Sequence, residues 1–489
     1  MNAPKSTPRS TSHSRGSKSA RSGLWGTRFG FYLAAIGSAF GLGNLWRFPY
    51  ITVDNGGGGF VFLYILFAIG IGLPLLVGEL MLGKLSRKSV VAAVSSPAIR
   101  GKTSGWVNGK DSKSWRWAGR LAAFTCLLVF AYYAVISGWV LHFLMQFFIG
   151  HLTTSSYDPE ASLRILRSSG LLQVLLTSVH LLISLVIVAK GVQEGMEKWV
   201  SNSMPVFVIL LIMLMLKSLS LPTAGEALRF LFYPDFTKLT AFSMLDALGH
   251  VFFTLSVGFG TMVTFGSYLN EQTRIPSAGF RVTVMDTVIS LFAGLLIFPL
   301  LATVNLKSAT PDLLFQTLPK LLQGLDSGFL FGLGFFICLY LAALGASIGL
   351  LESLVANVIE LTGLKRLHAT WATGCLALLL SIVPALSTTL FAGFHYRGRS
   401  FMEILDSLLI NGLLPLAALV VALALASSLK SSRESGGETS SVEAEFINDD
   451  SVATRKLFSH WIFVIRWVAP AVIVFSFALA IIGLIRENL

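Results

Sequence analysis

Charged residues are scarce in this sequence: Asp, Glu, Lys and Arg together make up only 13% of its 489 residues. Soluble globular domains contain about 25%. Hydrophobic residues reach 54%, and the mean hydropathy is +0.72. This shortage of charge excludes a soluble chain, because no hydrophilic stretch is long enough to form a soluble domain. We therefore expect a polytopic membrane protein surrounded by membrane lipid.

Acidic residues are fewer than basic ones, 25 against 37, which gives a formal net charge of +12. The basic residues are not gathered on one polar domain, so nucleic acid is not an expected partner. Cysteine is also rare. Cys126, Cys338 and Cys375 all lie in apolar runs and provide neither a disulfide framework nor a metal-ligand spacing. The first 28 residues lack acidic residues and are rich in Ser and Arg, as in a transit peptide or a cytosolic tail. Of these two alternatives we favour the tail, and we expect residues 1–24 to be disordered and cytoplasmic.

Long apolar runs, by contrast, are abundant. A helix needs about 20 mostly apolar residues to cross a hydrocarbon core of about 30 Å. Eleven segments meet this requirement: 29–54, 58–84, 120–149, 169–190, 199–219, 242–269, 280–306, 329–362, 367–387, 401–427 and 460–486. The expected fold class is an all-α polytopic membrane protein with eleven transmembrane helices.

The distribution of Lys and Arg predicts the orientation of these helices. With a cytoplasmic N-terminus, the cytoplasmic tail and loops hold 25 Lys and Arg residues and the opposite side holds 10. Cytoplasmic loops carry the excess of basic residues. The N-terminus is therefore expected inside and, with an odd number of helices, the C-terminus outside.

Two of the membrane segments are interrupted by small residues. The first contains Gly-Ser-Ala-Phe-Gly-Leu-Gly-Asn over 37–44, and the sixth contains Thr-Leu-Ser-Val-Gly-Phe-Gly-Thr over 254–261. Such runs either unwind the helix or allow close packing between helices. The interruptions lie five helices apart, at corresponding positions of two five-helix repeats. Paired breaks of this kind indicate an inverted-repeat secondary transporter.

The repeats predict the organisation of the chain. The first repeat covers 25–219 and the second covers 242–427, followed by a cytoplasmic loop over 428–459 and the eleventh helix within 460–489.

Extended motifs give this sequence a resemblance to a known family. They are Trp25–Gly30, Gly41–Tyr50, Asn55–Gly58, Gly72–Leu75 with Glu79, Tyr132–Tyr133, Phe252–Tyr268, Ser347–Glu352 and Asp406. The sequence closely resembles the neurotransmitter:sodium symporter family, in particular its bacterial leucine-transporter-like amino-acid transporters. The resemblance covers nearly the whole chain after residue 24. Eleven helices are typical of many prokaryotic members, which implies a prokaryotic inner plasma membrane.

The resemblance implies a site for an amino-acid zwitterion. Backbone N–H groups of Leu42 and Gly43 would bind its carboxylate, since the N-terminus of a half helix is electropositive, and Tyr133 would donate its hydroxyl to the same group. The ammonium is expected at carbonyls of Ala39 and of the 253–256 region, which includes Thr254. The implied side-chain pocket consists of Val129, Phe253, Ser256, Phe259, Ala346, Gly349 and Leu350.

Two features of this implied site restrict the substrate. The pocket carries no charge, which favours a neutral, apolar or aromatic substrate. Gly41 stands where carriers of monoamines have an acid, which favours an amino acid over a monoamine.

Sodium is the ion that the resemblance implies. Its first site would be formed by the side chains of Asn44 and Thr254, the carbonyl of Ala39 and the substrate carboxylate. Asp286 stands where many members have Asn, and a carboxylate inside a membrane segment is functional by default.

The second sodium site of the family is incomplete here. Gly345 and Ala346 replace the two hydroxyl residues that members generally have, which leaves only the carbonyls of Gly37, Phe40 and Ala342. Three backbone ligands under-coordinate a buried cation. We expect coupling to one sodium or, alternatively, to a proton through Asp286 and His250.

Chloride-dependent members bind their anion with four residues that correspond here to Tyr64, His250, Asp286 and Ser290. Asp286 already brings a negative charge beside the sodium, so we expect chloride independence. His250 titrates near neutrality; it could pair with Asp286 or respond to pH, or it could be a hydrogen-bonded core histidine.

Gate residues also match the family. Arg47 and Asp406 correspond to the extracellular pair, with Tyr133 and Phe253 as an aromatic lid. Trp25 and Glu360 correspond to the cytoplasmic gate. The arginine expected three residues before Trp25 is Ser22, with Arg21 adjacent. Glu79 is expected to stabilise the broken first helix.

The expected function is import of a neutral amino acid by alternating access, with a cation gradient as the driving force. The partners are the amino acid, sodium and lipid, and the chain is a monomer or a homodimer. A non-transporting receptor or slow channel on the same fold is the runner-up. A membrane enzyme is the third alternative. It is not expected, because no metal-binding or nucleophile motif projects into the helix bundle.

Overall fold

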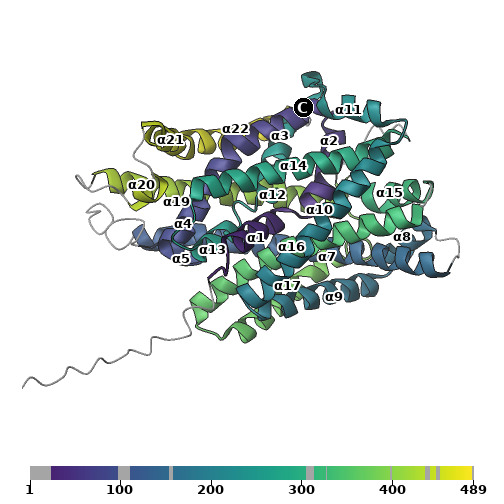
Figure 1. Cartoon of the computed structure of the whole chain (residues 1–489), viewed down its shortest axis with the longest axis horizontal. Helices are drawn as coiled ribbons and strands as arrows, with labels where there is room; N and C mark the ends of the chain where they lie inside the picture. Colours follow the sequence, from purple (N-terminus) through teal and green to yellow (C-terminus); the bar gives the residue numbers. More distant parts are fainter. Residues whose placement is uncertain are drawn as a thin grey trace, which may run out of the picture.

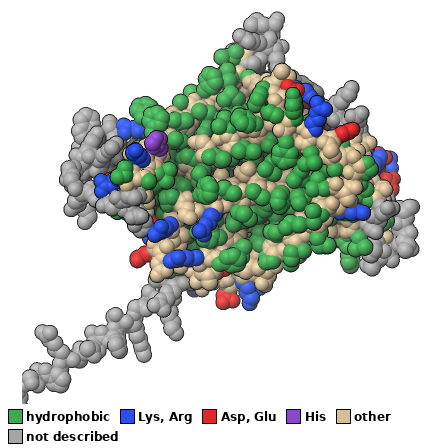
Figure 2. Space-filling model, turned by 45° about the horizontal axis from the view of Figure 1, so that its top comes forward, with side chains coloured by type: hydrophobic (Ala, Val, Ile, Leu, Met, Phe, Trp, Pro, Cys, Tyr) green, Lys and Arg blue, Asp and Glu red, His purple; other side chains and the backbone are tan. Residues whose placement is uncertain are grey.

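A computed structural model describes residues 24–96, 111–153, 158–303, 313–325, 328–396, 399–434, 441–447 and 452–486. Long helices run side by side along the horizontal axis of Figure 1. Ten of them are long and apolar enough to cross a membrane, and Ala241–Thr254 is a shorter apolar helix. Hydrophobic side chains cover the broad middle of the face shown in Figure 2, and charged ones lie around its margin. These features confirm an all-α polytopic membrane protein.

We number the membrane helices 1 to 11 in chain order. Their elements are α1 Arg28–Ala39, η2 Gly43–Arg47 and α2 Phe48–Asp54 (helix 1); α3 Gly58–Phe67, η3 Ala68–Gly72 and α4 Leu73–Ser86 (helix 2); α7 Asp111–Thr153 (helix 3); α9 Gly170–Ala189 (helix 4); η4 Val192–Glu197 and α10 Lys198–Leu219 (helix 5); α12 Ala241–Thr254 and α13 Thr261–Ser267 (helix 6); α14 Ile275–Ala302 (helix 7); α16 Gly328–Thr362 (helix 8); α17 Arg366–Ala385 (helix 9); α18 Phe401–Asp406, η6 Ser407–Leu413 and α19 Leu414–Glu434 (helix 10); and α21 Val452–Phe463, η7 Val464–Val468 and α22 Ala469–Arg486 (helix 11).

Short elements connect the membrane helices. At one end of the molecule lie α8 Pro159–Ser168, α11 Ala224–Phe232 and α15 Leu313–Gln323, and at the other end lie α5 Val90–Ala93 and α20 Ser441–Phe446 (Figure 1). The remaining elements are η5 Phe236–Lys238 and the antiparallel pair β1 His395–Tyr396 and β2 Arg399–Ser400.

The segment expected as a loop over 428–459 is partly helical where it is described. α19 extends to Glu434, α20 lies within the segment, and α21 begins at Val452. Basic residues at the start of α21 lower its hydropathy, so the apolar window alone places the beginning of helix 11 too late. Lys84 at the end of α4 forms an ion pair with Glu445, which holds α20 against helix 2. The expected tail over 1–24 lies outside the described residues except for Leu24.

Both expected helix breaks are present. α1 ends at Ala39, Phe40 is extended with φ −79° and ψ 94°, and the helix resumes at Gly43. In helix 6, Ser256, Gly258 and Gly260 have φ values of 54°, 87° and 75°. Such values suit glycine and strain other residues, so the backbone between α12 and α13 cannot continue the helix. The broken helices are the first and the sixth, as two five-helix repeats require.

Helix 2 packs directly against the second half of helix 6. A Cβ atom at Gly83 would lie 1.9 Å from the carbonyl oxygen of Val263, and one at Gly266 would lie 2.4 Å from that of Leu80. The two backbones therefore touch at both glycines. This contact fixes α13, and with it the far side of the helix 6 break.

Candidate functional site

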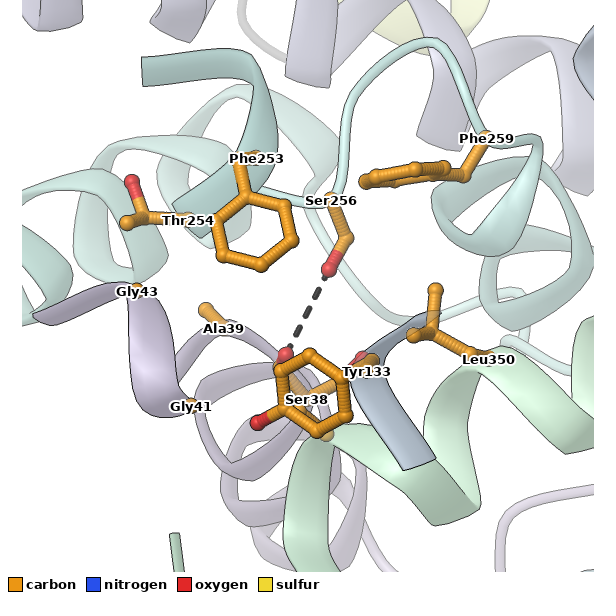
Figure 3. A pocket seen from close by; sticks show the side chains of 11 residues that line it. Ser38, Ala39, Gly41, Gly43, Tyr133, Phe253, Thr254, Ser256, Phe259 and Leu350 are labelled. Carbon is orange, nitrogen blue, oxygen red and sulfur yellow. Dashed lines mark hydrogen bonds between the residues drawn. The ribbon is translucent and has the colours of Figure 1, made fainter. Parts of the chain in front are cut away.

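A small buried cavity lies between the two helix breaks (Figure 3). Its volume is about 10 Å³, roughly the space that one water molecule needs. It is lined by Ser38, Ala39, Gly41, Gly43, Tyr133, Phe253, Thr254, Ser256, Phe259, Ala346 and Leu350. Nine of the twelve expected substrate residues line it, and Leu42, Val129 and Gly349 do not.

The start of the second half of helix 1 carries the polar end of this cavity. The backbone N–H of Leu42 donates a 2.9 Å hydrogen bond to the Tyr133 hydroxyl. A Cβ atom at Gly41 would lie 2.8 Å from that hydroxyl and 2.9 Å from the Cβ of Ala346. An acidic side chain at position 41 therefore has no room in this conformation. A carboxylate placed here would meet a backbone donor and a phenol donor together.

Aromatic rings form the walls of the cavity. The ring centroids of Tyr133 and Phe253 lie 6.1 Å apart, and those of Phe253 and Phe259 lie 6.4 Å apart. Figure 3 shows these rings around the central space, with Leu350 beside Phe259. These side chains provide an apolar environment with no charged group among the residues that line the cavity.

Ser38 lines the cavity, although its role was not expected from the sequence. Its backbone carbonyl accepts a 3.4 Å hydrogen bond from Ser256 Oγ (Figure 3). Its own hydroxyl is buried and has no hydrogen-bond partner within the described part of the chain. A Cβ atom at Gly349 would lie 2.2 Å from Ser38 Oγ, so Ser38 occupies the space beside Gly349, which was expected to line the substrate pocket. The position of Ser38 next to the break in helix 1 is the feature of the sequence from which its place in the cavity could have been predicted.

Asp286 lies at the centre of a fully buried polar cluster next to this cavity. Asn44 Nδ2 donates to Asp286 Oδ1 at 2.7 Å and to Ser290 Oγ at 2.9 Å. The Tyr64 hydroxyl donates to Asp286 Oδ2 at 3.4 Å and lies 3.1 Å from Ser290 Oγ. Among the described residues, no cationic side chain forms an ion pair with Asp286. A buried carboxylate without a counter-ion is costly, and either a bound cation or a proton relieves that cost.

The other expected sodium ligands lie at the same place. Ala39 and Thr254 line the adjoining cavity, and the Thr254 hydroxyl bonds to the carbonyl of His250 at 3.1 Å. The amide of Asn44 turns its oxygen toward the N–H of Gly41 at 3.4 Å. Carboxylate, amide, hydroxyl and carbonyl oxygens are the ligands that a small hard cation requires.

The region expected for a second sodium is closely packed. A Cβ atom at Gly345 would lie 2.7 Å from the carbonyl oxygen of Gly37 and 3.6 Å from Met204 Cε. Helix 1 therefore lies directly against helix 8 here, with a methionine beside them. Phe40 and Ala342 are buried in the same region. No space remains for hydroxyl side chains at 345, in agreement with their absence from the sequence.

His250 does not join the polar cluster. Its ring stacks on Phe48 with a centroid distance of 5.6 Å and lies 5.0 Å from the ring of Tyr64. Neither ring nitrogen has a hydrogen-bond partner among the residues that the structure describes. The pairing with Asp286 considered above is therefore not formed, and neither is the hydrogen-bonded core histidine.

The two residues expected to form the extracellular gate are in contact. Arg47 Nε lies 3.4 Å from Asp406 Oδ2, and the Arg47 side chain is only 1% exposed. Hydroxyls of Tyr50 and Tyr132 donate to the two oxygens of Asp406 at 2.9 and 3.0 Å. Arg47 also donates to Asn411 Oδ1 at 2.8 Å. Tyr50, Tyr132 and Asn411 extend the gate beyond the expected pair.

The residues expected at the cytoplasmic gate, Trp25 and Glu360, each bind another part of the chain. Trp25 is buried and donates through Nε1 to the carbonyl of Phe265 at 3.2 Å. Glu360 instead accepts hydrogen bonds from the N–H and hydroxyl of Ser89. Arg21 and Ser22 lie outside the described residues.

Two further buried carboxylates occupy the cytoplasmic half. Glu352 on helix 8 forms an ion pair with Arg366 and accepts a 2.8 Å hydrogen bond from the Tyr268 hydroxyl. Glu79 on helix 2 accepts a 2.7 Å hydrogen bond from the N–H of Gly258. The expectation that Glu79 stabilises the first broken helix is therefore wrong: its bond satisfies the break of helix 6, which lies directly against helix 2.

The sequence matches the model of a known protein family. The model of the sodium:neurotransmitter symporter family matches residues 22–160 and 162–488. The chain belongs to this family. It is 34% identical over 463 residues to YhdH of Bacillus subtilis, an uncharacterised sodium-dependent transporter, and the match covers 94% of this chain and 98% of the relative. An uncharacterised sodium-dependent transporter of Methanocaldococcus jannaschii is 31% identical, with 81% of this chain and 80% of the relative covered.

A solved structure agrees with the family. The crystal structure of MhsT in complex with L-phenylalanine matches with a TM-score of 0.82 and 32% identity, over 94% of this chain and 99% of that one. The family consists of transporters rather than enzymes. This symporter is therefore an integral membrane protein that couples transport to sodium.

Proposed function

We propose that this symporter imports a neutral, apolar or aromatic amino acid by alternating access. The observation that carries the proposal is the pairing of the Leu42 N–H with the Tyr133 hydroxyl, at the polar end of an uncharged aromatic cavity. These groups suit a carboxylate at one end and an apolar side chain at the other. L-phenylalanine, which is bound in the structure of MhsT, has this chemistry.

We propose a set of partners for each end of the substrate. The carboxylate would take the N–H groups of Leu42 and Gly43, at the positive end of the resumed helix, and the hydroxyl of Tyr133. The ammonium would meet the carbonyl of Ala39 and those released by the break after Phe253. The side chain would lie among rings and small residues: Phe253, Ser256, Phe259, Ala346 and Leu350.

We further propose that one sodium drives this import without chloride. Asn44, Thr254, the carbonyl of Ala39 and the substrate carboxylate would hold the ion, with Asp286 as the fixed negative charge. Tyr64 and Ser290 hydrogen-bond to this carboxylate or its neighbours, so an anion here would face Asp286. The contact between Gly37 and Gly345 argues against a second cation.

A screen of ligand-induced thermal stabilisation tests the proposal. The purified protein would be melted with each of the twenty amino acids, with sodium or choline as the cation, with chloride or gluconate, and at two pH values. Large neutral amino acids should raise the melting temperature only with sodium, independently of chloride. Stabilisation by a charged amino acid, or by none, would contradict the proposed substrate.

Coupling to a proton on Asp286 is the competing mechanism. It predicts stabilisation without sodium that increases as the pH falls. A receptor on the same fold would bind but would not exchange labelled amino acid across a proteoliposome membrane. The proposed setting is a prokaryotic inner plasma membrane, with the N-terminus cytoplasmic, the C-terminus outside, and the chain as a monomer or homodimer.

A further inference from the structure

The cytoplasmic start of membrane helix 1 is held by an acid on membrane helix 5. Glu197, the last residue of η4, accepts hydrogen bonds from the N–H of Gly26 at 2.8 Å and from the N–H and hydroxyl of Thr27 at 3.1 and 2.8 Å. Gln193 in the same segment donates to the carbonyl of Leu24 at 2.7 Å. A carboxylate is also favoured by the positive N-terminus of α1. Two side chains of η4 thus form hydrogen bonds with polar groups of residues 24–27, at the beginning of membrane helix 1.

Gly30 makes this contact possible. A Cβ atom at Gly30 would lie 2.0 Å from Glu197 Oε1 and 2.3 Å from the carboxyl carbon. The carboxylate therefore lies directly on the first turn of α1, in space that any larger residue would occupy. The Thr27 hydroxyl that donates to Glu197 also accepts the N–H of Gly30 at 2.8 Å. The Glu197 carboxylate can therefore reach the first turn of α1 only because residue 30 has no side chain.

The same half helix carries the candidate site. α1 has 12 residues and so is about 18 Å long. At its inner end lie the carbonyls of Gly37 and Ala39, beside the break. The residue expected at the cytoplasmic gate, Glu360, is instead bound by Ser89. Trp25 fastens the chain to α13 through the carbonyl of Phe265. Glu197 is the acid that fastens it to helix 5.

We propose that Glu197 is a positioning residue that keeps the cytoplasmic half of membrane helix 1 closed against helix 5. Opening toward the cytoplasm then requires its carboxylate to release Gly26 and Thr27. This inference rests on the proposed alternating-access function. It adds the contact between Gly30 and Glu197 to the contacts of Trp25 and Glu360 as a control of cytoplasmic opening.

Hydrogen-exchange mass spectrometry of the purified full chain, in sodium without amino acid, tests the inference. Glu197→Gln should accelerate exchange in peptides that cover residues 26–39 by about fivefold or more, because a neutral amide is a weaker acceptor for these donors. Glu194→Gln, an exposed acid in the same segment, is the matched control and should match the wild type. Equal exchange over 26–39 in Glu197→Gln and wild type would overturn the inference.

Gly30→Ala provides a second, independent variant. It keeps the carboxylate but pushes it away, so it should accelerate exchange in the same peptides. The double variant should exchange no faster than the faster single variant, since both remove one contact. Additive acceleration would show two unrelated defects and would contradict the inference. Peptides from α17 should exchange alike in all variants, and their acceleration would indicate general unfolding and count against a positioning role.

An uptake measurement separates this inference from the proposed function. If Glu197 controls cytoplasmic opening, Glu197→Gln should raise the KM for external substrate, because fewer molecules present the outward site. If the wild type transports no amino acid but the exchange pattern holds, the proposed function fails and the contact stands. If the wild type transports an amino acid but the exchange pattern is absent, the proposed function stands and the role of Glu197 fails.

Discussion

The Tyr133 hydroxyl is the residue-scale feature on which substrate binding depends most. Tyr133→Phe removes the group that accepts from Leu42 and would donate to the substrate carboxylate. Hydrogen bonds to charged groups contribute about 1.5–3 kcal/mol, so the substrate affinity should fall by about tenfold or more. Binding of labelled phenylalanine to the purified protein measures this change.

Tyr132 provides a matched control one residue away. Its hydroxyl donates to Asp406 rather than toward the cavity, so Tyr132→Phe removes an equal group from the gate. It should leave the substrate affinity within about threefold of the wild type, a free-energy change well below 1.4 kcal/mol. Equal losses in both variants would contradict the assignment of Tyr133 to the carboxylate.

We expect Asp286 to determine the ion dependence of transport. Asp286→Asn removes the buried negative charge from the cluster with Asn44, Tyr64 and Ser290. Sodium affinity should then fall by about tenfold, which corresponds to about 1.4 kcal/mol, and chloride should partly restore it. Uptake in chloride and in gluconate measures this, with the wild type indifferent to the anion. An Asp286→Asn variant that is equally active in both anions, with unchanged sodium affinity, would refute the role of Asp286.

Most residues of the site could be predicted from the sequence, because the motifs of helices 1 and 6 are local. Nine of the twelve expected substrate residues line the cavity. Ser38, Tyr50 and Glu197 were missed, since each acts through a contact between helices far apart in the chain. His250 is the opposite case, a residue whose predicted role is not supported. A histidine can titrate near neutrality, but this ring packs against the aromatic rings of Phe48 and Tyr64.

At the scale of elements, the contact between helix 2 and α13 fixes the second half of helix 6. Gly83→Ala would place a Cβ atom 1.9 Å from the Val263 carbonyl oxygen. Overpacking of this kind costs about 1–3 kcal/mol or more, so the melting temperature should fall clearly or folding should fail. Gly70→Ala in the same membrane helix is the control, because no atom lies within 4 Å of its Cβ position. A stable Gly83→Ala protein would contradict the packing.

The breaks themselves could be predicted as elements, because glycine pairs interrupt otherwise apolar runs. Their partners could not. Glu79 was assigned to helix 1, but it binds Gly258, since which helix faces helix 2 depends on glycine contacts across the bundle. The start of helix 11 was placed too late for a different reason, which lies in the hydropathy of its first residues. Basic residues lower hydropathy but do not end a helix that extends beyond the membrane core.

At the scale of the whole molecule, the excess of Lys and Arg in the loops predicts a cytoplasmic N-terminus and an external C-terminus. A C-terminal fusion to alkaline phosphatase should be active and a C-terminal fusion to green fluorescent protein should be dark, because an external C-terminus places only the phosphatase in the environment where it folds. The N-terminal fusions should show the opposite. Activity of the phosphatase at both ends, or at the N-terminus alone, would contradict the orientation.

Coupling of amino-acid import to one sodium is the central property that we propose for this symporter. The most direct test is uptake of labelled phenylalanine into proteoliposomes, with an inward sodium gradient, gluconate as the anion and sodium varied at constant ionic strength. We predict concentrative uptake that saturates with a Hill coefficient near one. Uptake that needs no sodium, or a Hill coefficient near two, would contradict the account.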